Sequence, residues 1–329
     1  MTLFRTNVKI PVSQDKFDYN SKAIMLGSCF TESIGEQLAK FKFDVNINPF
    51  GVIYNPISVG NSLKILIENK KFTEEDLNFS NERWFSFAHH GRFSNTDVNE
   101  CLDAINTEVK KSSLDLANSD VLYITFGTSW VFELLDTGIV VSNCHKLPAR
   151  EFHRYRLDVD EIVQFYKKLI VSLSVFNPNL KIVFTVSPIR HWKDGAHGNQ
   201  LSKATLLLAI EQLVDLFDQV SYFPSYEIVM DELRDYRFYA EDMLHMNSSS
   251  VNYIWSRFVD TYMTNQTLAV MKRVDKIVVA SNHRPFNADA ISHQQFITNT
   301  LDDLERLERE YPNIVFNKEK SRLLKNLHH

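Results

Sequence analysis

The stretch AIMLGSCFTESIGEQLAKF at residues 23–41 decides how the rest of the chain is interpreted. Its first four residues form an apolar run typical of a buried strand, and the following Gly-Ser-Cys breaks that run. Ile34, Leu38 and Phe41 then recur at helical spacing. A serine at such a junction, here Ser28, lies near the unpaired N–H groups of a helix start, which can stabilise a developing oxyanion.

The simpler interpretation of Ser28 is that it only links the strand to the helix. Ser33 and Glu36 fit the S-x-x-E capping box, which would then mark the start of the helix. A nucleophilic serine also needs a base within reach. Taken alone, the stretch favours the structural role.

A second stretch, YAEDMLHMN at residues 239–247, offers a base. Asp242 and His245 are three residues apart, so both can face one side of a turn, where the carboxylate would orient the imidazole. By itself this D-x-x-H pattern is equally typical of a surface pair at a helix start. The order of the motifs favours catalysis, because Ser28 follows the first strand and the pair follows the last.

The spacing of apolar residues predicts an α/β fold. Apolar runs at 22–28, 120–129, 181–190 and 225–233 are expected to be strands. Helical patterns lie between and after them, at 55–72, 95–119, 157–178 and 199–220. This alternation predicts a mostly parallel, doubly wound sheet. From Ser248 to about Phe316 the pattern is helical, with a break at 281–287.

Two further stretches, 82–92 and 137–152, are expected to be insertions near the mouth of a cleft; the second is expected to hold a strand followed by an irregular loop. In open α/β sheets, ligands bind outside the carboxyl ends of the strands. The loops at 27–31, 127–130 and 187–200 should therefore converge there.

Composition excludes several classes of function. The 329 residues are 44% hydrophobic, and the net charge of -5 provides no basic field for a nucleic acid. The first 17 residues mix charge and proline where a secretory signal would be apolar, and no segment is long enough to span a membrane. Three cysteines favour a reducing compartment, so we expect a cytoplasmic protein. Its size and aromatic loops are compatible with a homodimer.

Six motifs in order make the chain resemble a known family. They are LGSCFTESIG, NPFGVIYNP, ITFGTSWVFE, NCHKLPAREF, TVSPIRH and EDMLHMN. Together they resemble the GSCFA family of SGNH/GDSL esterase-like hydrolases, over residues 20–316. The resemblance implies a three-layer α/β/α fold of the flavodoxin-like, SGNH type. It implies a single domain over 1–329, with 248–329 as a helical extension of that domain. Thr31 stands where the family has alanine.

The resemblance also implies catalytic roles. It makes Ser28 the nucleophile, His245 the general base and then acid, and Asp242 the group that orients His245. An oxyanion hole of this type uses the N–H of the nucleophile and a glycine N–H, for which Gly51 is the candidate. No metal or organic cofactor is needed.

The third donor of the hole is where this sequence departs from the pattern. FGTSW stands where a G-x-N-D block is expected, so Ser129 or Thr128 occupies the place of the asparagine. Asn143 or Asn55 could instead reach in from another loop.

Several basic residues are candidates for substrate binding. His90, His145 and Lys146 are expected to line the cleft, or else to be ordinary loop residues; a zinc site with Cys144 is the minor alternative, because no close ligand pair is present. Arg190 and His191 follow a strand and suit a carboxylate, a phosphate or a sugar ring.

The sequence thus predicts a serine esterase that hydrolyses acyl esters, most simply acetyl esters on a carbohydrate. One alternative is an acyltransferase that uses the same triad. The other is a glycan-binding or scaffold protein with little turnover, because the third donor block is altered. The identity of the acyl and alcohol parts is left open.

Overall fold

The computed structural model describes residues 6–283 and 290–327. Its helices and strands are β1 (Lys22–Gly27), α1 (Cys29–Lys40), β2 (Asp44–Ile47), α2 (Pro56–Glu68), β3 (Asn78–Ser80), β4 (Arg83–Phe85), α3 (Val98–Ala117), β5 (Val121–Phe126), β6 (Trp130–Leu134), β7 (Phe152–Arg156), α4 (Val159–Phe176), β8 (Lys181–Val186), α5 (Gly195–Leu216), β9 (Val220–Tyr222), α6 (Ser225–Glu227), α7 (Ser248–Tyr262), α8 (Asn265–Ser281), α9 (Ile291–Glu310) and α10 (Asn317–Leu327).

The chain divides into two compact units. The first holds Met1–Ile10, Ala23–Gly35 and Asn46–Ser256, and the second holds Pro11–Lys22, Glu36–Val45 and Arg257–His329. The second unit therefore takes two short segments from the N-terminal part of the sequence. Whether both units fold as one cooperative domain, as expected from the sequence, stays a prediction.

The main sheet has five strands in the order β2-β1-β5-β8-β9. β1, β5, β8 and β9 pair in parallel, with Ala23 opposite Val121 and Val121 opposite Lys181. Counted along the chain, these strands follow the flavodoxin-like order 2-1-3-4-5, in which the strand order reverses beside β1. The α/β fold class predicted from the sequence is confirmed.

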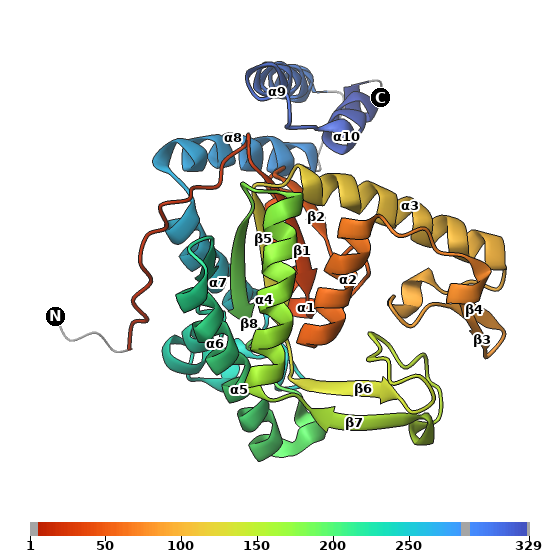
Figure 1. Cartoon of the computed structure of the whole chain (residues 1–329). Coiled ribbons are helices and arrows are strands. Elements are labelled where there is room, and N and C mark those ends of the chain that lie inside the picture. Colours follow the sequence, from red (N-terminus) through yellow and green to blue (C-terminus); the bar gives the residue numbers. More distant parts are fainter. Residues whose placement is uncertain (1–5, 284–289, 328–329) are drawn as a thin grey trace. The chain divides into compact units, whose positions relative to one another are not determined.

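Hydrophobic burial on both faces explains the central strands. All six residues of β5 are buried, as expected for a central strand whose two faces are both covered by helices. On one side α3, α2, α4 and α5 pack next to one another in that order, and Figure 1 shows α2 and α4 in front of the sheet. Tyr166 of α4, Phe126 and Phe184 form a buried aromatic cluster with ring centroids 5.3–5.5 Å apart. This cluster fixes α4 over β5 and β8.

The start of α4 illustrates how local sequence sets an element boundary. Asp158 accepts a hydrogen bond from the Glu161 N–H (2.8 Å), and the Glu161 carboxylate accepts one from the Asp158 N–H (2.7 Å). This reciprocal pair is a capping box, and it satisfies two N–H groups at the helix start. The buried face that follows packs on the sheet.

Two small antiparallel ribbons interrupt the α/β pattern. β3 pairs with β4, and β6 pairs with β7. The insertion expected at 82–92 contains β4. The strand expected within 137–152 is wrong in extent, because β6 precedes this stretch and only Phe152 at its end belongs to β7.

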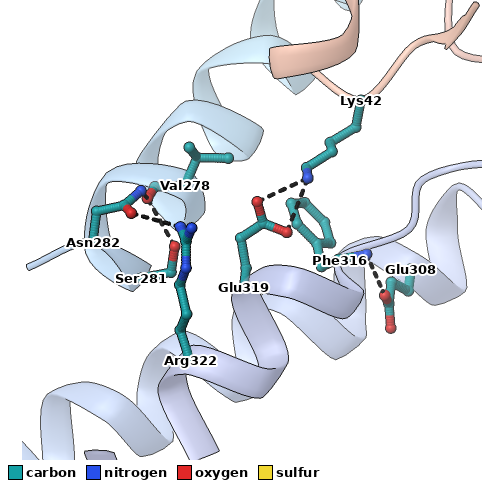
Figure 2. Close-up of polar contacts among 8 residues, drawn as sticks. All are labelled: Lys42, Val278, Ser281, Asn282, Glu308, Phe316, Glu319 and Arg322. Atoms are coloured by element: carbon teal, nitrogen blue, oxygen red, sulfur yellow. Dashed lines mark hydrogen bonds and ion pairs between the residues drawn. The ribbon is translucent and has the colours of Figure 1, made fainter. Parts of the chain in front are cut away.

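The second unit contains α8, α9 and α10, of which α10 contacts both others. Figure 2 shows Glu319 of α10 facing Lys42, whose ammonium lies 2.8 and 2.9 Å from the two carboxylate oxygens. Arg322 donates to the Asn282 side chain at the end of α8 (2.6 Å). The break expected at 281–287 falls mostly on residues outside those described.

One strand prediction is wrong. Residues 225–232 form α6 and a π-helical turn. The backbone is helical here, and the side chains of Ile228, Val229 and Glu232 in the π-helical turn are buried. The fifth strand of the sheet is instead β9, just before them. The short edge strand β2 was not predicted at all. In residues 6–283 and 290–327, no helix has the length and apolar character needed to cross a bilayer.

Candidate active site

Ser28 lies at the carboxyl end of β1, directly before the first residue of α1. Gly27 has φ +147°, and a Cβ there would come within 2.2 Å of the Thr125 carbonyl oxygen, so glycine is required. The Ser28 N–H donates to that same oxygen (3.2 Å), and the Ser28 Oγ accepts a hydrogen bond from the Phe30 N–H (3.3 Å). The sheet and the helix start therefore hold Ser28 from both sides.

The capping box predicted at Ser33 and Glu36 is wrong. α1 begins at Cys29, so Ser33 lies inside the helix, where its Oγ donates to the Cys29 carbonyl (3.4 Å). Ser28 is therefore the residue that occupies the strand-to-helix junction. A capping contact and a catalytic role for its hydroxyl remain compatible.

Asp242 and His245 form a preassembled pair on a turn. The Nδ1 of His245 lies 2.5 Å from Oδ2 of Asp242. Oδ1 of Asp242 accepts hydrogen bonds from the N–H groups of Leu244 and His245, both at 2.9 Å. These bonds, with the His245 N–H first, hold the pKa of Asp242 down to about 2. The carboxylate is ionised at neutral pH and fixes the imidazole.

The arrangement sets the tautomer of His245. A carboxylate only accepts hydrogen bonds, so the proton between the two groups is on Nδ1, and Nε2 of the neutral ring is left with a lone pair. This is the form that a general base requires. Both side chains are about half exposed, so the pair is open to a substrate.

Ser28 and His245 line the same pocket, which we call the Ser28 pocket. Its volume is about 280 Å³. The residues that line it come mainly from the loops after β1, β5 and β8 and from the turn of the pair: Ser28, Cys29, Tyr54, Gly127, Ser187, Ile189, Arg190, His191, Trp192, Lys193, Leu244 and His245. In the part of the chain that the structure describes, no hydrogen bond joins the Ser28 hydroxyl to the His245 ring. Such bonds often tighten only when substrate is present.

The N-terminal end of α1 faces this junction with partial positive charge. The helix begins at Cys29, immediately after Ser28, and its N-terminus carries a partial positive charge. The Phe30 N–H already donates to the Ser28 Oγ (3.3 Å), and the Thr31 N–H donates to the Ser28 carbonyl (2.8 Å). The helix therefore contributes its dipole to an oxyanion on a substrate bound to Ser28, and these two N–H groups are not free donors.

The other predicted donors are engaged elsewhere. The Gly51 N–H donates to the Asn48 carbonyl (2.7 Å). Ser129 is fully buried, and both its N–H (2.8 Å) and its hydroxyl (3.2 Å) donate to the Ser202 Oγ. Neither Gly51 nor Ser129 lines the Ser28 pocket. We therefore correct the predicted hole, because neither residue has a donor free to face the pocket.

Two more of the residues considered as substitutes for the missing asparagine also have structural roles. The Thr128 hydroxyl lies 3.0 Å from the Ser202 Oγ and accepts from the Trp130 N–H (3.1 Å). Asn55 caps α2, and its Oδ1 accepts from the Ser58 N–H (2.8 Å). Neither side chain is available to a ligand in the Ser28 pocket.

Four predicted substrate residues lie in a different pocket. His90, Asn143, His145 and Lys146 line a pocket of about 510 Å³ that shares no lining residue with the Ser28 pocket. These four residues do lie together, as expected, but they do not line the pocket that contains Ser28. Burial lowers the pKa of His145, which stacks on Phe85 at 4.2 Å. Its ring is therefore a neutral packing group at physiological pH.

Arg190 and His191 do line the Ser28 pocket. Burial first, and then the charge of Lys203, lower the pKa of His191 to about 4, so its ring is neutral at pH 7. Its ring meets the edge of Tyr54 at 5.3 Å. These two residues are placed where they were expected.

The cysteines are not activated nucleophiles. Burial raises the pKa of the Cys29 thiol and of the Cys144 thiol, so both stay protonated at neutral pH. Within 6–283 and 290–327, the structure has no cluster of three or more His, Cys, Asp or Glu side chains arranged to hold a metal ion.

Comparison with protein families identifies the chain. The model of the GSCFA family matches residues 22–258, and the model of the GSCFA domain protein C-terminal domain matches residues 274–329. The chain belongs to the GSCFA family. A search of curated proteins finds no significant match.

Two solved structures are similar to this GSCFA chain. A family 3 carbohydrate esterase of Clostridium thermocellum has 12% identity and a TM-score of 0.33, and the match covers 77% of this chain and 97% of that one. An acetyl xylan esterase from the rumen bacterium Butyrivibrio proteoclasticus has 13% identity and a TM-score of 0.37, over 78% of this chain and 64% of that one.

Sequence reasoning missed one residue beneath the site of this GSCFA protein. Lys203 of α5 is fully buried, and its ammonium donates to the carbonyls of Gly127 and Ser187, both at 2.6 Å. Burial lowers its pKa to about 7. The sequence pattern indicates its burial: Lys203 lies three residues before Leu206 and seven before Ile210, which places it on the buried face of the helix.

Proposed function

We propose that this GSCFA protein is a serine esterase that hydrolyses small acyl esters, most simply acetyl esters on carbohydrates. The observation that carries the proposal is that Ser28 and His245 line one pocket while Asp242 binds the His245 ring, although Ser28 lies far from the other two in the sequence. A buried serine at a helix N-terminus and a carboxylate-bound imidazole on the same pocket are the components of a Ser-His-Asp triad.

The proposed mechanism uses only side chains of the protein. His245 Nε2 accepts the Ser28 proton while Oγ attacks the ester carbonyl. The tetrahedral intermediate then collapses, and His245 protonates the leaving alcohol. Water, deprotonated by His245, attacks the acyl-enzyme and releases the acid and free Ser28. Asp242 stays ionised and stabilises the imidazolium in both steps.

The size of the Ser28 pocket favours a small acyl group. Pockets for drug-sized ligands measure roughly 300–1,000 Å³, and this one, at about 280 Å³, lies just below that range. Trp192 and Lys193 at its rim are exposed, so the alcohol part can extend outward. An acetyl ester of a larger polar alcohol fits this shape.

A specific observation favours a second candidate, a glycan-binding protein with little turnover. The N–H groups of Ser28 and Gly51 and the Ser129 hydroxyl all donate to protein acceptors. Loss of a single oxyanion donor costs about 3–4 kcal/mol of transition-state stabilisation. If no other donor replaces them, binding would persist while hydrolysis became slow.

The test is hydrolysis of p-nitrophenyl acetate and of acetylated sugars, together with labelling by a fluorophosphonate. We expect turnover and labelling in the native protein, and loss of both in Ser28→Ala and His245→Ala. Ser33→Ala, in the helix that follows Ser28, and His197→Ala, exposed on α5, are matched controls that keep activity.

The outcomes separate the candidates. Equal turnover by native protein and Ser28→Ala would refute the esterase. Absence of labelling together with tight glycan binding would support the second candidate. Partition of the acyl group to an added sugar acceptor rather than to water would identify a transferase that uses the same residues.

A further inference from the structure

A second cavity adjoins the Ser28 pocket, and we call it the Arg190 groove. It has a volume of about 440 Å³ and shares Arg190, Trp192 and Leu244 with the Ser28 pocket. Asp242, the carboxylate of the pair, also faces it. The polar and aromatic residues that line it include Arg190, Trp192, Arg234, Asp235, Tyr236 and Asp242. A molecule in the groove would therefore lie beside the reacting carbonyl.

The charge of Arg190 is not neutralised by the protein. Among the described residues its guanidinium has no carboxylate partner, and its one hydrogen-bond contact is to the Met230 sulfur, at 3.9 Å. The side chain is half-buried between the two cavities. An arginine that has lost part of its hydration without gaining a counter-ion is suited to bind an anion from outside.

The acidic groups of the groove are already committed. Asp242 is bound to His245, and Asp235 lies 3.8 Å from Arg237. Arg234, the other cation of the groove, is bound to Asp231 (2.6 Å). Arg190 is therefore the one cation lining the groove that has no carboxylate partner among the described residues, and it lies where the groove meets the Ser28 pocket. The Asp242 carboxylate keeps its negative charge, because the His245 ring that it binds is neutral.

Aromatic surfaces flank this charge. Trp192 is 54% exposed and Tyr236 is 74% exposed, and the Tyr236 ring lies 6.0 Å from that of Tyr239. Large exposed rings around a polar groove provide flat apolar faces together with polar tips. The apolar C–H face of a sugar ring can stack on such rings while its hydroxyls stay hydrated. A flat, polar and anionic ligand matches both features.

We propose that the Arg190 groove binds the alcohol part of the ester as a sugar ring that carries a carboxylate, with Arg190 as the carboxylate-binding residue. The proposal rests on the esterase function for the position of the ester, but binding of the acidic sugar does not require turnover. The planar guanidinium matches a carboxylate with two parallel N–H···O bonds. This identifies the substrate class as acetyl esters of acidic, rather than neutral, carbohydrates.

The test compares three acetylated methyl glycosides that differ in charge: a glucuronoside, a glucoside and a cationic glucosaminide. We expect kcat/KM for the glucuronoside to exceed that for the glucoside by about 10- to 100-fold, the worth of a charge-assisted hydrogen bond. Arg190→Gln should bring this ratio close to one. Arg190→Glu should reverse it in favour of the glucosaminide. The ratio cancels any general loss of activity or folding.

The matched control is Arg150→Gln, an exposed arginine that lines neither cavity, and it should keep the native ratio. Equal rates on charged and neutral sugars, with hydrolysis intact, would overturn the groove proposal and leave the esterase standing. Preferential binding of a phosphorylated sugar would also overturn it, since the ligand class would then be phosphate. Titration with unesterified methyl glucuronoside tests binding in the groove independently of hydrolysis. Arg190-dependent binding, together with no hydrolysis of any ester, would support the groove proposal and refute the esterase proposal.

Discussion

Lys203 allows a quantitative prediction about stability. Its ammonium is fully buried and bonded to the carbonyls of Gly127 and Ser187, yet burial lowers its pKa from 10.5 to about 7. Between these two pH values, the unfolded chain holds a proton that the folded protein has released. Folding stability due to Lys203 therefore rises with pH over this window. It is lowest at and below about pH 7 and levels off above about pH 10.5.

The magnitude follows from the two pKa values. Each full pH unit within the window is worth about 1.4 kcal/mol, but Lys203 is already half deprotonated at pH 7, so the gain between pH 7 and pH 9 is about 2 kcal/mol. In Lys203→Met this term vanishes, and each of two buried carbonyls loses its donor at a cost of about 1–3 kcal/mol. At pH 7 that cost is offset by relief of the buried charge, so the variant should be nearly as stable as the native protein. At pH 9 it should be less stable by about 2 kcal/mol.

Urea unfolding of native protein and Lys203→Met at both pH values measures this difference. Of the groups coupled to Lys203, burial raises the pKa of the Cys29 thiol above its ordinary value, and burial lowers the pKa of His191 to about 4, below the window. Lys168→Met, an exposed change on α4, is the control and should show no pH-dependent difference. A native-minus-variant difference that is flat or falls from pH 7 to pH 9 would show that Lys203 is fully charged in the fold.

The remaining predictions concern the site and its supports. Asp242→Asn should lower kcat/KM for p-nitrophenyl acetate by a factor smaller than the loss in Ser28→Ala, because the imidazole keeps a hydrogen-bond partner; an unchanged rate would remove Asp242 from the triad. Gly27→Ala should lower the melting temperature, because the added Cβ would lie only 2.2 Å from the Thr125 carbonyl oxygen; thermal unfolding followed by circular dichroism measures the change, and an unchanged melting temperature would contradict it. Ser129→Asn, which would place an asparagine at the position expected for the third oxyanion donor, should destabilise the fold by about 1–3 kcal/mol through overpacking against Ser202, without raising the rate; a faster and equally stable variant would contradict the assigned role.

The parts of the fold that were predictable are those whose sequence signal is strong and local. β5 is buried on both faces, and five of its six residues are apolar, with Thr125 as the exception; the central helices carry long amphipathic patterns. β2 has four half-buried or exposed residues at a sheet edge, and β9 has three residues, so neither leaves such a signal. At 225–233, the burial of Ile228 and Glu232 four residues apart is a helical pattern that was mistaken for an apolar strand.

The site divides in the same way. The Asp242–His245 pair lies within one turn, so its geometry could be inferred from spacing. The oxyanion donors could not, because a backbone N–H is a donor for substrate only if no other group binds it, and that depends on contacts across the fold. The Gly51 N–H is bound by Asn48 and the Ser129 hydroxyl by Ser202, neither of which the motifs reveal. The sequence shows which residues could act as hydrogen-bond donors. Tertiary contacts decide which of those donors are already bound to protein acceptors and which can face a substrate.

The strand order explains why the remaining free groups collect where they do. In a 2-1-3-4-5 sheet the chain leaves β1 and β5 toward opposite edges, which opens a crevice at their carboxyl ends. Ser28 follows β1 at this crevice, and Gly127 and Ser187 follow the next two strands. Lys203 donates to a carbonyl in each of these two loops, so one buried ammonium links the loop after β5 to the loop after β8, which carries Arg190. The turn with His245 is held by its own bonds, and Leu244 on this turn lines both cavities. A ligand that fills the Arg190 groove therefore contacts the loop that carries Arg190 and the turn that carries His245 at the same time.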